Sequence, residues 1–218
     1  MRGAFMKEKI GEVFSVAKDN APIRGCTVSR EVMAGTSYYS LAEDTDISAE
    51  MYPYHKLLLV SSGEITVYGS DFSFDVREGD AVIAPTDVPV GVRTSGGAVY
   101  TEITTERRSY MNKAVKIGEA FKLASLVPYQ EGKIVNMDVV HNDKMKFVIM
   151  AFDAGTGLSE HAAPGEAIVF ALDGEAVIGY EGVMHKVKAG ECFSFAKGGK
   201  HFVKATGRFK MALLLTLE

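Results

Sequence analysis

The feature of this sequence that most restricts its fold is an internal repeat. From about residue 26 onward, positions 111 apart correspond without a gap, so that Gly63 matches Gly174 and Pro53 matches Pro164. Glycine and proline are selected by backbone geometry at turns, so their coincidence indicates equivalent turns in two copies. The chain is therefore predicted to contain two copies of one module.

Each copy has the pattern of an all-β module. Short apolar runs are separated by turn residues at intervals of about 8–12 positions, which is typical of a β-sandwich or barrel. In the second copy the runs include 146–152 (KFVIMAF) and 167–172 (AIVFAL). The final run, 210–217 (KMALLLTL), corresponds to 99–106 (VYTEITTE) in the first copy. Both modules are predicted to be barrels of short strands.

The repeat and the length give expected domain boundaries. A chain of 218 residues suits two domains of about 100 residues each. The first barrel is expected at 1–106 and the second at 118–218. The segment between them, 107–117, is expected to be a linker.

Composition excludes several classes of protein. The formal net charge is −4, which gives no attraction for nucleic-acid phosphates. No apolar run is long enough for a signal peptide or for a membrane span of about 18 residues. We therefore expect a cytoplasmic protein without nucleic-acid or membrane partners. Cys26 and Cys192 are expected to be reduced, buried thiols.

Two segments of the second copy resemble the metal-binding motifs of the cupin superfamily. Residues 157–174 read GLSEHAAPGEAIVFALDG, and residues 190–201 read GECFSFAKGGKH. Cupins are jelly-roll barrels in which three histidines and a glutamate hold a metal ion. The resemblance implies two tandem cupin barrels, in a chain similar to small bacterial cupin-2 conserved-barrel proteins. It also implies a divalent transition metal, with Fe, Mn, Zn and Ni all open.

Only part of the cupin ligand set is present. His161 stands at the first histidine position and His201 at the last, whereas Ala163 and Ala167 occupy the other two ligand positions. Glu166 is one residue out of register, and in a regular strand it would face away from the site. A β-bulge at Pro164–Gly165 would turn the Glu166 side chain toward the site. The candidate metal ligands are His161, His201 and Glu166, because two histidines and a carboxylate can hold a divalent ion with open positions.

The first copy lacks a recognisable site. Positions 111 residues apart correspond in the two copies. Glu50 therefore corresponds to His161, Lys56 to Ala167 and Val90 to His201. This module is expected to be structural. A cluster of tyrosines in it is interpreted as core or interface, with ligand binding as the alternative. The cluster comprises Tyr38, Tyr39, Tyr52 and Tyr54.

The sequence is compatible with two functions. One is a metal-dependent enzyme that acts on a small molecule in the second barrel, with no catalytic residue identified. The other is a non-catalytic protein with a small-molecule-binding, sensing or structural role and no tightly bound metal. A homodimer is also expected, because apolar runs such as 57–60 (LLLV) require cover.

Overall fold

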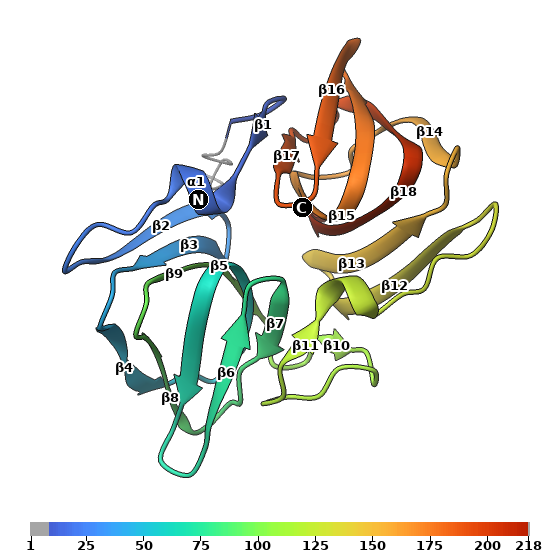
Figure 1. Cartoon of the computed structure of the whole chain (residues 1–218). Helices are drawn as coiled ribbons and strands as arrows, with labels where there is room; N and C mark the ends of the chain where they lie inside the picture. Colours follow the sequence, from blue (N-terminus) through green and yellow to red (C-terminus); the bar gives the residue numbers. More distant parts are fainter. Residues whose placement is uncertain (1–8, 218) are drawn as a thin grey trace. The chain divides into compact units, whose positions relative to one another are not determined.

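The structure is a computed structural model that describes residues 9–217 and divides the chain into two compact units. Both are built almost entirely of β-strands, which confirms the predicted all-β fold (Figure 1). The described part of the first unit comprises Val16–Ser109 and Lys113–Lys122. The second comprises 9–15, Tyr110–Asn112 and 123–217.

The first unit is a barrel in which one long strand, β5, pairs with four others. One sheet has the order β11-β7-β5-β9-β3-β2, while β6 and β8 also pair with β5, and β4 pairs with β8. The elements of this unit are α1 (Val16–Asp19), β2 (Thr27–Met33), β3 (Thr36–Leu41), β4 (Thr45–Met51), β5 (His55–Tyr68), β6 (Ser73–Arg77), β7 (Asp80–Ile83), β8 (Pro89–Thr94), β9 (Ala98–Thr105) and β11 (Phe121–Lys122).

The second unit repeats this arrangement around β15 and β18. Its path is β1-β17-β15-β18-β13-β12-β10, with β14 paired to β18 and β16 paired to β15. The elements are β1 (Val13–Phe14), β10 (Tyr110–Met111), η1 (Leu123–Ser125), β12 (Ile134–His141), β13 (Met145–Phe152), β14 (Gly157–Ala162), β15 (Ala167–Tyr180), β16 (Val183–Lys188), β17 (Cys192–Phe195) and β18 (Lys200–Thr216).

The strand register reproduces the repeat seen in the sequence. Glu50 pairs with Val90 in the first barrel, and the equivalent His161 pairs with His201 in the second. Each of these ladders is interrupted at the same place, just before Glu50 and just before His161. Corresponding residues of the two barrels therefore occupy equivalent positions.

Each barrel has its own apolar core. Leu58, Val60 and Tyr100 belong to the core of the first barrel. Phe193 and Phe209 are fully buried in the second. The inward positions alternate along each strand, because side chains two residues apart share a face.

Two segments belong to a unit other than the one their sequence position suggests. Strand β1, near the amino terminus, pairs with β17, and the Gly11 amide donates to the Ser194 carbonyl. Residues 9–15 are thus part of the second unit. Strand β11 pairs with β7 of the first unit, although the repeat suggests that 118–122 begin the second barrel.

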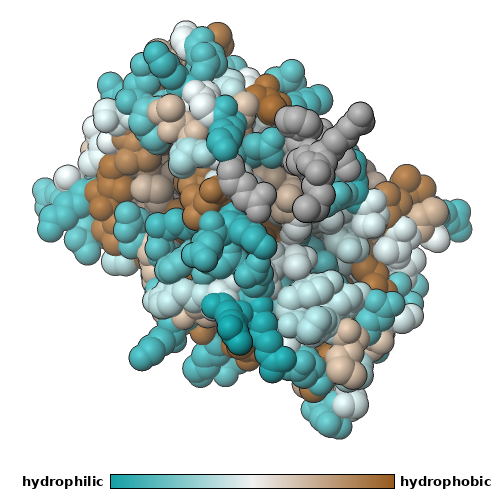
Figure 2. All heavy atoms as spheres, turned by 180° about the vertical axis from the view of Figure 1, so that it is seen from behind, coloured by the Kyte–Doolittle hydropathy of each residue, from teal (hydrophilic) through white to brown (hydrophobic). Residues whose placement is uncertain are grey.

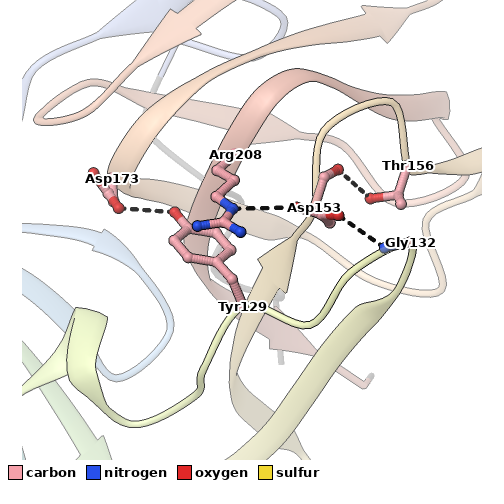
Figure 3. Close-up of polar contacts among 6 residues, drawn as sticks. All are labelled: Tyr129, Gly132, Asp153, Thr156, Asp173 and Arg208. Carbon is pink, nitrogen blue, oxygen red and sulfur yellow. Dashed lines mark hydrogen bonds and ion pairs between the residues drawn. The ribbon is translucent and has the colours of Figure 1, made fainter.

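The segment before β12 is attached to the second barrel by a polar cluster (Figure 3). The Tyr129 hydroxyl donates to Asp173 Oδ2 at 2.8 Å, and Arg208 Nε donates to Asp153 Oδ1 at 3.2 Å. The Arg208 guanidinium also lies over the Tyr129 ring, 5.3 Å from its centroid. The hydrogen bond from the Gly132 amide lowers the pKa of the Asp153 carboxyl, and the hydrogen bond from Arg208 lowers it by a smaller amount. Tyr129 and Gly132 are thus bonded to Asp173 of β15 and to Asp153, which follows β13.

The surface carries only scattered apolar residues on the face that Figure 2 displays, where brown positions are interspersed with teal ones. Among residues 9–217, no helix has the length and apolar character needed to cross a membrane. Cys192 is buried as expected, whereas Cys26 is exposed, so the prediction of two buried thiols was wrong for Cys26. The expected homodimer stays a prediction.

Candidate functional sites in the two barrels

In the second barrel the structure brings together the two histidines that the sequence singles out. His161 on β14 and His201 on β18 are direct cross-strand partners, and their ring centroids are 4.2 Å apart. Directly opposed residues of an antiparallel pair project from the same face of the sheet. The two imidazoles therefore form one cluster.

Hydrogen bonds to the backbone orient both rings. Nδ1 of His161 lies 2.8 Å from the Ser159 carbonyl oxygen, and Nδ1 of His201 lies 3.1 Å from that of Gly199. A carbonyl oxygen only accepts, so each Nδ1 carries the proton. In a neutral imidazole the lone pair is then on Nε2, the atom left to bind a metal ion or a ligand.

His201 is the more deeply placed of the pair. Its ring stacks on Phe195 with centroids 4.0 Å apart and is 8% exposed, whereas His161 is exposed. Burial lowers the pKa of His201 below its ordinary value; the Gly199 carbonyl opposes this effect and His161 adds to it. The neutral form of His201, which can act as a ligand, is therefore favoured at neutral pH.

Alanines at the other two ligand positions supply no donor to the cluster. Ala163 and Ala167 are buried in the core. Glu166 immediately precedes β15, and its carbonyl accepts a hydrogen bond from the Thr216 amide. Among residues 9–217, no group of three or more His, Cys, Asp or Glu side chains could hold a metal ion. Two imidazoles are fewer ligands than a tightly held resident ion takes from a protein, so the donor set present does not fit such an ion.

The first barrel contains a cavity of about 60 Å³, and three of the tyrosines that the sequence singles out, Tyr39, Tyr52 and Tyr54, line it. Its lining combines four tyrosines and an ion pair with apolar side chains, the composition expected of a small-molecule site. The lining residues are Tyr39, Ile47, Ser48, Tyr52, Tyr54, Lys56, Leu58, Ala84, Pro85, Val90, Val92, Tyr100 and Glu102.

An ion pair that is largely shielded from water stands in the wall of this cavity. Lys56 Nζ lies 3.2 Å from Glu102 Oε1, and the two side chains are 17% and 12% exposed. The same Nζ lies 3.7 Å from the centroid of the Tyr52 ring. Burial raises the pKa of Glu102, and the Lys56 ammonium limits this rise. Glu50 accepts a hydrogen bond from the Tyr52 hydroxyl.

Tyr100 provides a buried hydroxyl beside the ion pair. Its ring stacks on Tyr39 with centroids 4.9 Å apart, and the residue is fully buried. Among the described residues its hydroxyl has no hydrogen-bond partner. Burial raises the pKa of Tyr100, and the nearby Glu102 carboxylate raises it further. The hydroxyl is therefore a neutral donor without an acceptor.

Two sequence signals could have indicated this cavity. Lys56 occupies the position of a cupin ligand, as the 111-residue offset already shows. Tyr100 and Glu102 are two residues apart in one strand and therefore share a face. The pairing of β9 with β5 that brings them to Lys56 cannot be derived from either strand alone.

Comparisons with known proteins agree with this architecture. Residues 148–217 match the cupin domain family. A cupin 2 conserved barrel domain protein from Leptotrichia buccalis is 27% identical, with a TM-score of 0.87 over 98% of this chain and 100% of that one. No curated protein sequence matches.

More distant structures share the fold alone. AerE from Microcystis aeruginosa is 16% identical, with a TM-score of 0.54 over 90% of this chain and 96% of that one. A variant of Bacillus subtilis oxalate decarboxylase is 12% identical, with a TM-score of 0.56 over 95% of this chain and 78% of that one.

The strand topology and the comparisons together define the fold. The chain has a cupin fold, in the form of two tandem barrels. Residues 148–217, which match the cupin domain family, lie in the second of these barrels. A fold of this kind serves both metal-dependent enzymes and non-catalytic proteins, so the function has to be argued from the two sites.

Proposed function

We propose that this two-barrel cupin is a small-molecule-binding protein whose binding site is the cavity of the first barrel. The observation that supports the proposal is the Tyr100 side chain, which lines the cavity and whose buried hydroxyl has no hydrogen-bond partner among the described residues. Such a group costs about 1–3 kcal/mol, which a ligand that supplies an acceptor would recover. The proposal gives the first barrel a ligand-binding function, whereas the sequence predicts a structural role for it.

The affinity is expected to be modest. A ligand of about four non-hydrogen atoms gains at most about 1.5 kcal/mol per atom, or about 6 kcal/mol in total. For four non-hydrogen atoms the dissociation constant is therefore no tighter than about 0.04 mM. The chain contains nine tyrosines and no tryptophan, so tyrosine emission, to which the four cavity tyrosines contribute, is measured without interference from indole.

The test is a titration of the full chain with small acids, amides, alcohols and amines, followed by tyrosine emission. We expect at least one class to bind saturably to the parent protein and not to Val90→Phe, because Val90 lines the cavity and phenylalanine would fill it. Val88→Phe is the matched control, since Val88 is exposed and outside the lining. Binding by no class, or equal binding by both variants, would contradict the proposal.

The second barrel supports a second candidate, a metal-dependent function at His161 and His201. The supporting observation is that both Nδ1 atoms are directed to carbonyl oxygens, which leaves two adjacent Nε2 atoms as donors. With so few protein ligands, any ion would be exchangeable, and its identity among Fe, Mn, Zn and Ni is open. Glu166 is the proposed third ligand.

A metal titration tests this candidate. Calorimetric titration with Zn²⁺ or Mn²⁺ is expected to show one weak site that disappears when His161→Ala and His201→Ala are combined. His185→Ala, which removes a histidine of β16 outside the pair, should leave that site intact. Weaker binding by Glu166→Gln would support the carboxylate as a ligand. The metal hypothesis fails if the double variant binds as the parent does.

A further inference from the structure

The cavity of the first barrel contains a positive charge that the protein holds in a fixed position. Lys56 Nζ is held from one side by Glu102 Oε1 at 3.2 Å and from another by the Tyr52 ring, whose centroid is 3.7 Å away. An ammonium over an aromatic face is attracted to it, and more strongly when water is excluded. The contacts restrict a side chain that is flexible when exposed. The charge is therefore preorganised before a ligand arrives.

The position that a cationic ligand would take is already filled by Lys56. An amine entering the cavity would compete with Lys56 for the same ring face and the same carboxylate. An ammonium has three N–H donors, and Glu102 accepts from one of them. An oxygen acceptor on the ligand would complement this arrangement, whereas a second cation would not.

The remaining polar groups of the cavity also favour an acceptor. The Tyr100 hydroxyl needs a partner, and its raised pKa keeps it protonated as a donor. The carboxylate of the lining, Glu102, is engaged by Lys56, and that of Glu50, which is outside the lining, accepts from the Tyr52 hydroxyl. The Lys56 ammonium offsets the negative charge of Glu102 in the cavity wall, which reduces the repulsion of an arriving anion.

The size and the apolar lining restrict the ligand further. The volume of the cavity is about 60 Å³. A group the size of a water molecule needs about 10–15 Å³, so about four to six non-hydrogen atoms fit the cavity. Leu58 and Val92 line it and are almost fully buried, so they would contact an alkyl group rather than a second charge.

We infer that the first-barrel cavity binds a small aliphatic monocarboxylate, held by the Lys56 ammonium and by the Tyr100 hydroxyl. The inference rests on the proposed function and names the class of ligand for the same site. Charge-assisted hydrogen bonds to the ammonium select a carboxylate over an uncharged compound of the same shape. The alkyl end of the ligand is accommodated by the apolar wall.

The experiment compares matched compounds on the full chain at constant ionic strength. Acetate and propionate are titrated beside acetamide, propionamide and ethylammonium, with tyrosine emission and calorimetry as readouts. We expect each acid to bind at least about tenfold more tightly than its amide, as a hydrogen bond to a charged group implies. Ethylammonium should not bind.

Variants test the two residues separately. Tyr100→Phe removes only the hydroxyl and should weaken propionate binding by about three- to tenfold, the effect of one hydrogen bond. Tyr38→Phe is the matched control, because Tyr38 is a buried tyrosine outside the cavity lining. Lys56→Met should abolish propionate binding, with retained folding checked by circular dichroism.

Three outcomes would overturn the inference. Amides that bind as tightly as acids, or ethylammonium that binds best, would reject a carboxylate ligand and leave the proposed binding function standing. Equal propionate binding by Tyr100→Phe and the parent would remove the hydroxyl from the site, and this variant decides the matter even if Lys56→Met fails to fold. Binding by none of the compounds, nor by any other class tested, would reject the inference and the proposed function together.

Discussion

Replacing Lys56 by methionine is expected to lower the free energy of unfolding by about 3 kcal/mol at neutral pH, because it leaves a shielded carboxylate without its counter-ion. Glu102 is only 12% exposed, so water compensates little for the loss. Urea unfolding followed by tyrosine emission measures the effect. A loss below about 1 kcal/mol would mean that the pair behaves as a surface ion pair.

The loss in free energy of unfolding caused by Lys56→Met should depend on pH in a defined direction. Burial raises the folded-state pKa of Glu102 above its ordinary value of 4.5, and Lys56 opposes this rise, so its removal raises the pKa further. An acid whose pKa is raised on folding destabilises the protein above that pKa and not below the unfolded value. The difference from the parent should therefore shrink as pH falls from 7 toward 4. Combining Lys56→Met with Glu102→Gln should remove the pH dependence.

Gly174→Ala is expected to destabilise the second barrel by about 2–5 kcal/mol. Gly174 has φ of 71°, and a Cβ there would lie 2.0 Å from the Arg208 carbonyl oxygen. The left-handed conformation costs a non-glycine residue about 1–2 kcal/mol, and the forced displacement adds about 1–3 kcal/mol. The repeat partner, Gly63, has the same geometry, with φ of 76° and the Gly97 carbonyl oxygen 2.2 Å away.

Gly190→Ala is the matched control for this prediction. Gly190 has φ of 83°, and nothing lies within 4 Å of an added Cβ. This variant should lower the free energy of unfolding only by the cost of the left-handed conformation, about 1–2 kcal/mol. Equal losses in the two variants, measured by urea unfolding, would show that the close approach to Arg208 has no energetic effect.

The repeat made most of the fold predictable. Turn glycines recur at the same spacing, and the equivalent ladders that join Glu50 to Val90 and His161 to His201 have the same register. The closeness of the two histidines follows from that register and from the cupin motifs. Glu166 remains a predicted ligand, since its one-residue offset from Ala167 leaves the direction of its side chain to the local backbone.

The cavity of the first barrel was harder to predict, for a physical reason. Its ion pair joins Lys56 on β5 to Glu102 on β9, two residues that are 46 positions apart and ordinary on a surface. Only the cross-strand pairing makes them neighbours inside the barrel. A motif describes residues of one segment, whereas this site is formed by strands β3, β4, β5, β8 and β9.

The pairing of β1 with β17 has a consequence for the synthesis of the chain. Val13 is made 180 residues before its partner, Phe193. Strand β1 must wait, unpaired, while this long stretch of polypeptide is made, and closing so long a loop is slow. The second barrel thus becomes complete only after β17 has been made. A fragment that begins at residue 107 or 118 would lack this edge strand from the start.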